Sequence, residues 1–464
     1  MIKVALIWLT SAVLLHASMG EKIRAMITKH DIKSEQISVM IRSAKTGNIL
    51  ASINADQVRK PASVMKILTT YSALLELGFG FRWPTKFYYH GSYKKGVIQG
   101  DLIIKAYGDP TLSDKDIPKI VKRLRAVGVK SVTGNIVIDR SFFDVGERIT
   151  SGFDAHRFSE YNAMPDAMMF NDHLSAIVVK PKGKKIIAYK STQDRSYEVI
   201  NNIKPSSKTC VGNRSWPRIL INTESTLPRV TLSGTMSLKC RPRIIKKLVT
   251  HSYKSFYYAL KAEMRLRGIA FGGNLHLSKT PSGARALFTH YAKPLTGIVA
   301  KTNKKSNNLY ARHLMLLLGA KLYGAPATEK KGRKAVEAVL EKAGLSSWRY
   351  TYLDNGCGLS RTSRITAKVL SNILHNANRK HGTQWRKTLS IAGVDGTIRK
   401  RFRKTVAKGR AWMKTGTLKD AKNIAGYVRS KGSKRLYSVV ILYNGREKWK
   451  GSALQNQIIN WLAK

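Results

Sequence analysis

The sequence predicts an α/β domain whose sheet joins both ends of the chain and which is interrupted by an inserted, mostly β region. Near the N-terminus, the apolar runs 37–41 and 49–53 flank a Thr-Gly-Asn turn signal, which predicts two neighbouring strands. Near the C-terminus, residues 423–428 and 436–443 have a similar strand-like composition. Between residues 85 and 289, short apolar runs alternate with turn signals, as is typical of β structure.

Helical periodicity occupies the intervening segments. A helix should begin around Pro61 and end at Gly78, because apolar residues recur at helical spacing between them. Further helical patterns begin near residue 294 and cover about 453–462.

These patterns predict where the chain divides. We expect one domain formed by residues 21–84 and 290–464. Residues 85–289 should form an insert, made of two small subdomains.

Residues 1–20 have the features of a secretory signal peptide. A lysine at position 3 precedes an almost purely apolar run from Val4 to Leu15, and the small residues that follow predict cleavage near Gly20. The apolar run is too short to span a bilayer comfortably, so we favour a cleaved signal peptide over a membrane anchor. No later stretch approaches the ~18 apolar residues of a membrane-spanning helix. We therefore expect an exported, periplasmic or otherwise extracytoplasmic protein with no transmembrane span in its mature chain.

The chain is very basic, with 83 Lys and Arg residues against 27 Asp and Glu residues and a formal net charge of +56. This excess points to a polyanionic partner, which could be nucleic acid, an anionic membrane face or a polymer of the cell envelope. The predicted export argues against nucleic acid. We expect salt-sensitive binding to anionic cell-envelope polymers.

The three cysteines predict one bridge and no metal site. Cys210 and Cys240 lie in one region, where an oxidising compartment favours a disulfide; two unpaired buried thiols are the alternative. Cys357 lies between two glycines, as expected of a small residue in a tight loop. The sequence has no CxxC pair and no HExxH motif, so we expect no metal and no cofactor.

Three short motifs occur in the order SxxK, SxN and KTG. They are Ser63 with Lys66, Ser306 with Asn308, and Lys414-Thr415-Gly416. Each motif occurs a second time elsewhere in the chain, so each alone is a weak signal. The set is informative because one copy of each lies where its chemistry needs it, the first at the start of a helix and the last shortly before a strand.

The SxxK spacing can supply an activated nucleophile. Residues i and i+3 share one face of a helix, so Ser63 and Lys66 can form a hydrogen bond. A serine hydroxyl needs an adjacent base, and a neutral lysine can serve if its pKa falls from about 10.4 to near 7. Burial of Lys66 and a second positive charge at Lys414 are expected to cause that fall. The backbone N–H groups of Ser63 and Thr417 are candidate donors to an oxyanion.

Together the motifs make the chain resemble the serine penicillin-recognising enzymes. Within them it is similar to the low-molecular-mass class C penicillin-binding proteins, the D-alanyl-D-alanine carboxypeptidase/endopeptidases. The similar segments are Pro61–Lys66, Gly108–Leu112, Asp354–Arg361, Ala392–Thr397 and Lys414–Leu418. The resemblance covers nearly all of the mature chain and implies a β-lactamase/transpeptidase-like catalytic domain, with an antiparallel sheet and helices. One departure is Cys357, where the family usually has serine.

The resemblance also implies roles for the motif residues. Ser63 would attack the carbonyl of the penultimate D-alanine of a peptidoglycan stem peptide and form an acyl-enzyme, with Lys66 as base. Ser306 would pass a proton to the leaving amine, and Asn308 would hold the substrate amide.

The KTG segment would bind the end of the substrate. Lys414, Thr415, Gly416 and Thr417 would hold the terminal carboxylate, or the equivalent group of a β-lactam antibiotic. Arg399 would help to position substrate, although one more basic surface residue is an equally good interpretation.

Other functions stay open at this level. A β-lactamase or esterase on the same scaffold would differ in how fast water releases the acyl group. A non-catalytic envelope-binding protein would keep the fold alone. The balance between carboxypeptidase and endopeptidase activity depends on the shape of the groove in the insert.

Overall fold

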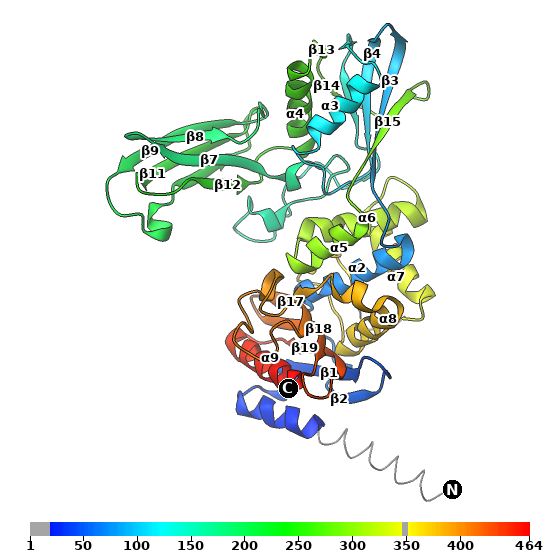
Figure 1. Ribbon diagram of the computed structural model, residues 1–464, viewed down its shortest axis with the longest axis vertical. Coiled ribbons are helices and arrows are strands. Elements are labelled where there is room, and N and C mark those ends of the chain that lie inside the picture. The colour runs from blue at the N-terminus through cyan, green and yellow to red at the C-terminus, as the bar shows by residue number, and fades with distance from the viewer. Residues whose placement is uncertain (1–18, 346–350) are drawn as a thin grey trace, which may run out of the picture. The chain divides into compact units, whose positions relative to one another are not determined.

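The computed structural model describes residues 19–345 and 351–464, which divide into two compact units (Figure 1). Unit 1 comprises the N-terminal residues up to Phe81, Pro294–Tyr323 and Glu329–Lys464. Unit 2 comprises Arg82–Lys293 and Gly324–Thr328. Most of the expected signal peptide lies outside the described residues, which begin at position 19.

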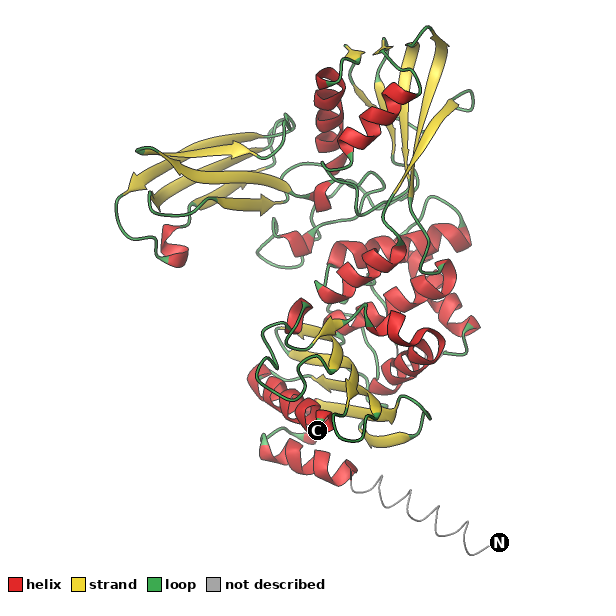
Figure 2. Cartoon of the chain, in the orientation of Figure 1, coloured by secondary structure: helices red, strands yellow, loops and turns green. Residues whose placement is uncertain are grey.

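Within the described residues, unit 1 contains a six-stranded antiparallel sheet built from both ends of the chain (Figure 2). Its order is β16-β17-β18-β19-β1-β2. The strands are β1 (Ile37–Ser43), β2 (Ile49–Ile53), β16 (Ser390–Ile391), β17 (Ala411–Leu418), β18 (Ala421–Arg429) and β19 (Leu436–Tyr443). β1 pairs with β19, and Val39 lies opposite Ile441. The predicted α/β class, with a sheet that joins the termini, is confirmed.

The helices of unit 1 pack on this sheet or on one another. They are residues 19–29, α2 (Met65–Leu77), α5 (Leu295–Lys304), α6 (Asn308–Tyr323), α7 (Glu329–Lys342), α8 (Ala367–Arg386) and α9 (Lys448–Ala463). α8 contacts β1, β18 and β19, α9 contacts β18 and β19, and α2 contacts α5, α6, α7 and α8. No helix in the described part of the chain is long and apolar enough to cross a membrane.

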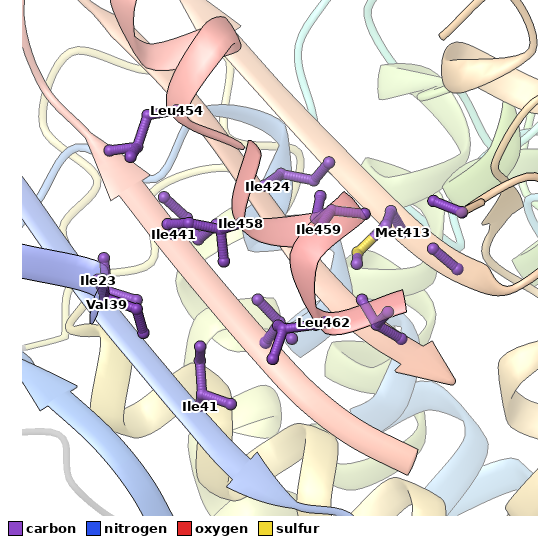
Figure 3. Packing of buried hydrophobic residues seen from close by; sticks show 14 of the residues in the cluster. Ile23, Val39, Ile41, Met413, Ile424, Ile441, Leu454, Ile458, Ile459 and Leu462 are labelled. Atoms are coloured by element: carbon purple, nitrogen blue, oxygen red, sulfur yellow. The ribbon is translucent and has the colours of Figure 1, made fainter. Parts of the chain in front are cut away.

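One face of the sheet is buried under helix 19–29 and α9 (Figure 3). Ile23 from the first helix and Ile458 from α9 are fully buried together with strand residues such as Ile424 and Ile441. Because successive strand residues point to opposite faces, the neighbour of Ile424, Asn423, points to the other face. Lys414 and Gly416 of the KTG motif lie on the same face as Asn423.

The start of α2 differs from the expected helix. Ala62–Val64 forms a 3₁₀ turn, here called the serine turn, and the α-helix begins only at Met65. Ala62 has a left-handed φ of 48°, which an α-helix cannot contain, so α2 starts after it. Gly78, with φ 74°, ends the helix as predicted.

The KTG motif lies inside a strand, whereas we expected it before one. β17 has few strand-forming residues at Lys414-Thr415-Gly416, and its extended form comes from pairing with β18, where Gly416 lies opposite Asn423. The two strands are consecutive and Leu418 pairs with Ala421, so the hairpin extends over the motif although the motif residues themselves favour no strand.

Unit 2 is mostly β, as predicted, and its described residues form one seven-stranded and two three-stranded sheets. The large sheet contains β3 (Pro84–Lys94), β4 (Val97–Ala106), β5 (Ser131–Val132), β6 (Ile136–Asp139), β13 (Ala270–Phe271), β14 (Leu275–Leu277) and β15 (Arg285–Tyr291). The small sheets contain β7 (Ser175–Lys182), β8 (Lys185–Lys190) and β12 (Arg243–Lys247), and β9 (Glu198–Ser206), β10 (Arg218–Asn222) and β11 (Arg229–Ser237). Two helices that the sequence analysis did not assign, α3 (Ile117–Ala126) and α4 (Ser252–Leu266), contact each other.

A disulfide links Cys210 and Cys240 beside the core that the two small sheets share. Their Cα atoms are 5.2 Å apart, and Cys240 is buried in this core. Cys357 is a buried free thiol.

Removing the disulfide should destabilise the small sheets of unit 2. The bridge joins residues separated by 30 positions, and the chain-entropy model gives such a loop about 3–4 kcal/mol of stabilisation. The double variant Cys210→Ser, Cys240→Ser should therefore unfold at a lower temperature in calorimetry. A reducing agent should lower the wild-type transition and leave that of the variant unchanged; equal transitions for both proteins would contradict this expectation.

Candidate active site

The SxxK motif places a serine hydroxyl against a fully buried amine. Lys66 lies in the first turn of α2, and its Nζ is 2.8 Å from Ser63 Oγ. Nζ also donates hydrogen bonds to Asn308 Oδ1 at 2.8 Å and to the Cys357 carbonyl oxygen at 2.6 Å. Three segments that are distant in sequence therefore meet at one nitrogen atom.

Burial lowers the pKa of Lys66 from 10.5 to about 8. Interaction with Cys357 acts in the opposite direction, and the positive charge of Arg312 adds to the lowering. The expected fall in the pKa of Lys66 is thus present, with burial as its main cause. The second cation that contributes is Arg312, where we had expected Lys414.

Lys414 is the second buried amine. It lies in β17, fully buried, and its Nζ donates hydrogen bonds to Ser306 Oγ at 2.9 Å and to the Thr415 carbonyl oxygen at 2.8 Å. Burial lowers the pKa of Lys414 well below its usual value, and the nearby Lys66 lowers it further. We expected Lys414 to be protonated, but its burial and the nearby Lys66 favour the neutral amine instead.

The SxN motif lies at the junction of α5 and α6. Ser306 has a left-handed φ of 57° at the start of this junction, and Asn307 Oδ1 accepts a hydrogen bond from the Tyr310 backbone N–H. That contact satisfies a donor in the first turn of α6, as an N-cap does. It fixes the start of the helix from which Asn308 reaches Lys66.

Two glycines allow the chain to close around the serine turn. A Cβ on Gly416 would lie 2.8 Å from the Pro61 carbonyl oxygen and 2.9 Å from the Ser63 backbone nitrogen. A Cβ on Gly358 would lie 1.9 Å from the Ala62 carbonyl oxygen. Only glycine therefore permits these approaches.

The remaining predicted residues lie around β17. Thr415 Oγ1 donates a hydrogen bond to Thr397 Oγ1 at 2.8 Å, and Thr417 Oγ1 accepts one from Lys422 Nζ at 3.3 Å. Arg399 is exposed, and among the described residues no hydrogen bond or ion pair links its side chain to the motif residues.

Sequence reasoning missed two groups in this network. Thr397 lies in the 3₁₀ helix Gly396–Ile398, and only its place in the similar Ala392–Thr397 segment could have indicated it. The Cys357 carbonyl is a main-chain atom, so no residue type could indicate it; its thiol donates to Asn355 Oδ1 at 3.1 Å. In the ranges that the structure describes, no group of three or more His, Cys, Asp or Glu residues could hold a metal ion.

Comparison with known proteins identifies the family. The model of the D-Ala-D-Ala carboxypeptidase 3 (S13) family matches residues 19–464. The chain is 24% identical over 407 residues to a D-alanyl-D-alanine carboxypeptidase of Haemophilus influenzae, covering 85% of this chain and 83% of the relative. It is 25% identical over 466 residues to the D-alanyl-D-alanine carboxypeptidase of Actinomadura sp. strain R39, covering 96% and 84%.

A solved structure shares the fold. The crystal structure of penicillin binding protein 4 from Haemophilus influenzae matches with a TM-score of 0.78 at 24% identity, over 95% of this chain and 99% of that one. A predatory endopeptidase from Bdellovibrio bacteriovorus matches with a TM-score of 0.54 at 16% identity, over 92% of each chain. The chain belongs to the D-Ala-D-Ala carboxypeptidase 3 (S13) family and is a serine carboxypeptidase.

Proposed function

We propose that this chain cleaves the D-Ala-D-Ala and D-Ala-diaminopimelate bonds of peptidoglycan stem peptides through an acyl-enzyme on Ser63. The observation that carries the proposal is the set of three contacts at Lys66 Nζ. Two of its partners, Asn308 Oδ1 and the Cys357 carbonyl, can only accept hydrogen bonds. A neutral amine has two N–H groups and one lone pair, so when both acceptors are served the lone pair faces the Ser63 hydroxyl. Lys66 is then placed to take the hydroxyl proton as Ser63 attacks.

The second amine, Lys414, has the partners needed for the leaving group. Its hydrogen bond to Ser306 places a hydroxyl that can pass a proton to the leaving amine. A bound carboxylate would favour the charged form of Lys414 and so raise its pKa again. The Thr415 and Thr397 hydroxyls would share in binding that carboxylate.

The oxyanion that forms during attack needs donors from two elements. The Ser63 N–H comes from the serine turn and the Thr417 N–H from β17, and the glycine contact at Gly416 keeps these elements together. Asn308 would position Lys66 through Oδ1 while it contacts the substrate amide. Water then releases the acyl group, and penicillins would acylate the same serine.

Treatment with penicillin should modify Ser63. Mass spectrometry of the intact protein should show one covalent adduct, and peptide mapping should place it on Ser63. The variant Ser63→Ala lacks the nucleophile and should show no adduct and no release of D-alanine from a stem-peptide substrate. An adduct on another residue would exclude the proposal, whereas an adduct that water clears rapidly would favour the β-lactamase alternative.

Acylation should accelerate as pH rises. Only neutral Lys66 can accept the proton, and its fraction grows through a pKa of about 8, so the rate should reach half of its maximum near pH 8. Stopped-flow measurement with a chromogenic cephalosporin would give this profile. The variant Lys66→Arg should lose acylation at every pH, because its guanidinium stays protonated. A flat profile in the wild type would contradict the role of Lys66.

We also propose that the protein is exported by residues 1–20 and acts outside the cytoplasm, where its excess of basic residues draws it to anionic cell-envelope polymers. Support comes from the formal charge of +56 and from the envelope substrate of the proposed reaction. Arg399 is exposed, as a residue of this basic surface would be, and we assign it no part in catalysis.

Adsorption to isolated cell-wall sacculi should fall as salt rises. Charges separated by more than about 8–10 Å are screened at physiological ionic strength, so much of the attraction is lost at high salt. Co-sedimentation at low and high salt would measure it, with an acidic protein of similar size as the control. Binding that does not change with salt would rule out an electrostatic origin.

A further inference from the structure

The two residues before the serine turn are held by side chains of the sheet. Asn444, which follows β19, accepts a hydrogen bond from the Lys60 N–H at 2.7 Å and donates one to the Lys60 carbonyl at 3.2 Å. Asn423 of β18 donates through Nδ2 to the Lys60 carbonyl at 2.8 Å and to the Pro61 carbonyl at 2.9 Å. Proline has no N–H, so every main-chain polar group of these two residues is bound by one of the two amides.

The next residue, Ala62, explains why such a restraint is needed. Its φ of 48° is unfavourable for a residue with a side chain. It persists only where the surroundings fix the chain on either side. The amides fix the residues before it, and α2 fixes those after it.

Asn423 retains its position at a cost. It is fully buried, and its Oδ1 has no hydrogen-bond partner among the described residues. A buried polar atom without a partner destabilises a fold, because it has lost its hydrogen bonds to water. An apolar residue could fill this space without an unpaired polar atom. The unpaired Oδ1 is therefore explained only if the Nδ2 donor of Asn423 is needed. Its register places that donor opposite Gly416, where β17 approaches the serine turn.

We propose that Asn423 and Asn444 are positioning residues that fix the serine turn against β17 and so set the separation of the Ser63 and Thr417 N–H groups. This inference rests on the proposed function, in which those two groups stabilise the oxyanion. Neither asparagine contacts Lys66, whose partners are Ser63, Asn308 and the Cys357 carbonyl. Loss of either amide should therefore lower the rate of acylation without changing the pH at which Lys66 titrates.

The same substitution should act differently at the two positions. Asn423→Asp replaces a donor that serves two carbonyls with a carboxylate oxygen that repels them, and acylation should slow about 100-fold, as when an oxyanion donor is lost. Asn444→Asp keeps the acceptor for the Lys60 N–H and loses only the longer contact, so acylation should stay within about 5-fold of the wild type. Asn444→Ala loses both contacts and should slow acylation about 10-fold or more.

The experiment is stopped-flow acylation with a chromogenic cephalosporin across pH, together with the melting temperature of each variant. Asn378→Asp is the matched control, because Asn378 Nδ2 donates to the Ala44 carbonyl and so holds the turn after β1. It should be acylated at the wild-type rate. The expected result is a lower maximal rate in Asn423→Asp and Asn444→Ala. Asn444→Ala adds no charge, so its pH midpoint and its apparent affinity for the cephalosporin should equal those of the wild type.

Several outcomes would overturn the inference. They are an acylation rate of Asn423→Asp within about 2-fold of the wild type, a shifted pH midpoint in Asn444→Ala, or an equal loss in Asn444→Asp and Asn444→Ala. If Asn423→Asp does not fold, the test rests on the two variants of the partly exposed Asn444, Asn444→Asp and Asn444→Ala. An Asn444→Ala variant that is acylated as fast as the wild type then overturns the inference. A wild-type protein that penicillin does not acylate would instead refute the proposed function.

Discussion

The burial of Lys66 is the constraint on which the rest of unit 1 depends. An amine removed from water must donate its hydrogen bonds to acceptors of the protein, because an unpaired buried charge or donor is strongly unfavourable. Its three partners come from the serine turn, from the start of α6 and from the loop at Cys357. The helices and loops that surround α2 thus provide the hydrogen-bond partners of one nitrogen atom. Burial there lowers the pKa of Lys66 to about 8, so a larger fraction of this amine is neutral near neutral pH.

The two buried lysines leave the site without a compensating negative charge among the described residues. Burial lowers the pKa of both Lys66 and Lys414, and the nearby Lys66 lowers the pKa of Lys414 further. In the proposed reaction, a substrate that ends in a carboxylate would supply a negative charge beside Lys414. Burial of Lys66 would increase the fraction of this amine that is neutral and able to act as a base. Binding of an anionic substrate end and activation of the serine would then both depend on the burial of these two lysines.

Local patterns in the sequence were enough to predict the parts of the site that are local. The i, i+3 spacing gave the contact between Ser63 and Lys66, and strand-like runs at both ends of the chain gave the sheet. The strand form of β17, the Cys357 carbonyl and the amides of Asn423 and Asn444 were not predictable in this way. Each depends on main-chain atoms or on pairing between distant segments, and neither leaves a pattern in neighbouring residues.

The long insert raises the question of how unit 1 keeps this geometry when its sequence is interrupted between α2 and α5. The answer lies where the chain leaves and returns. The Leu295 N–H donates to the Phe81 carbonyl at 2.8 Å, and the Thr296 N–H donates to the Phe79 carbonyl at 3.2 Å. The two ends of the interruption are thus bonded to each other within unit 1. Because the entropy of closing a loop grows only slowly with its length, a pair of adjacent ends can carry an insert of any size while α2 and α6 keep their places around Lys66.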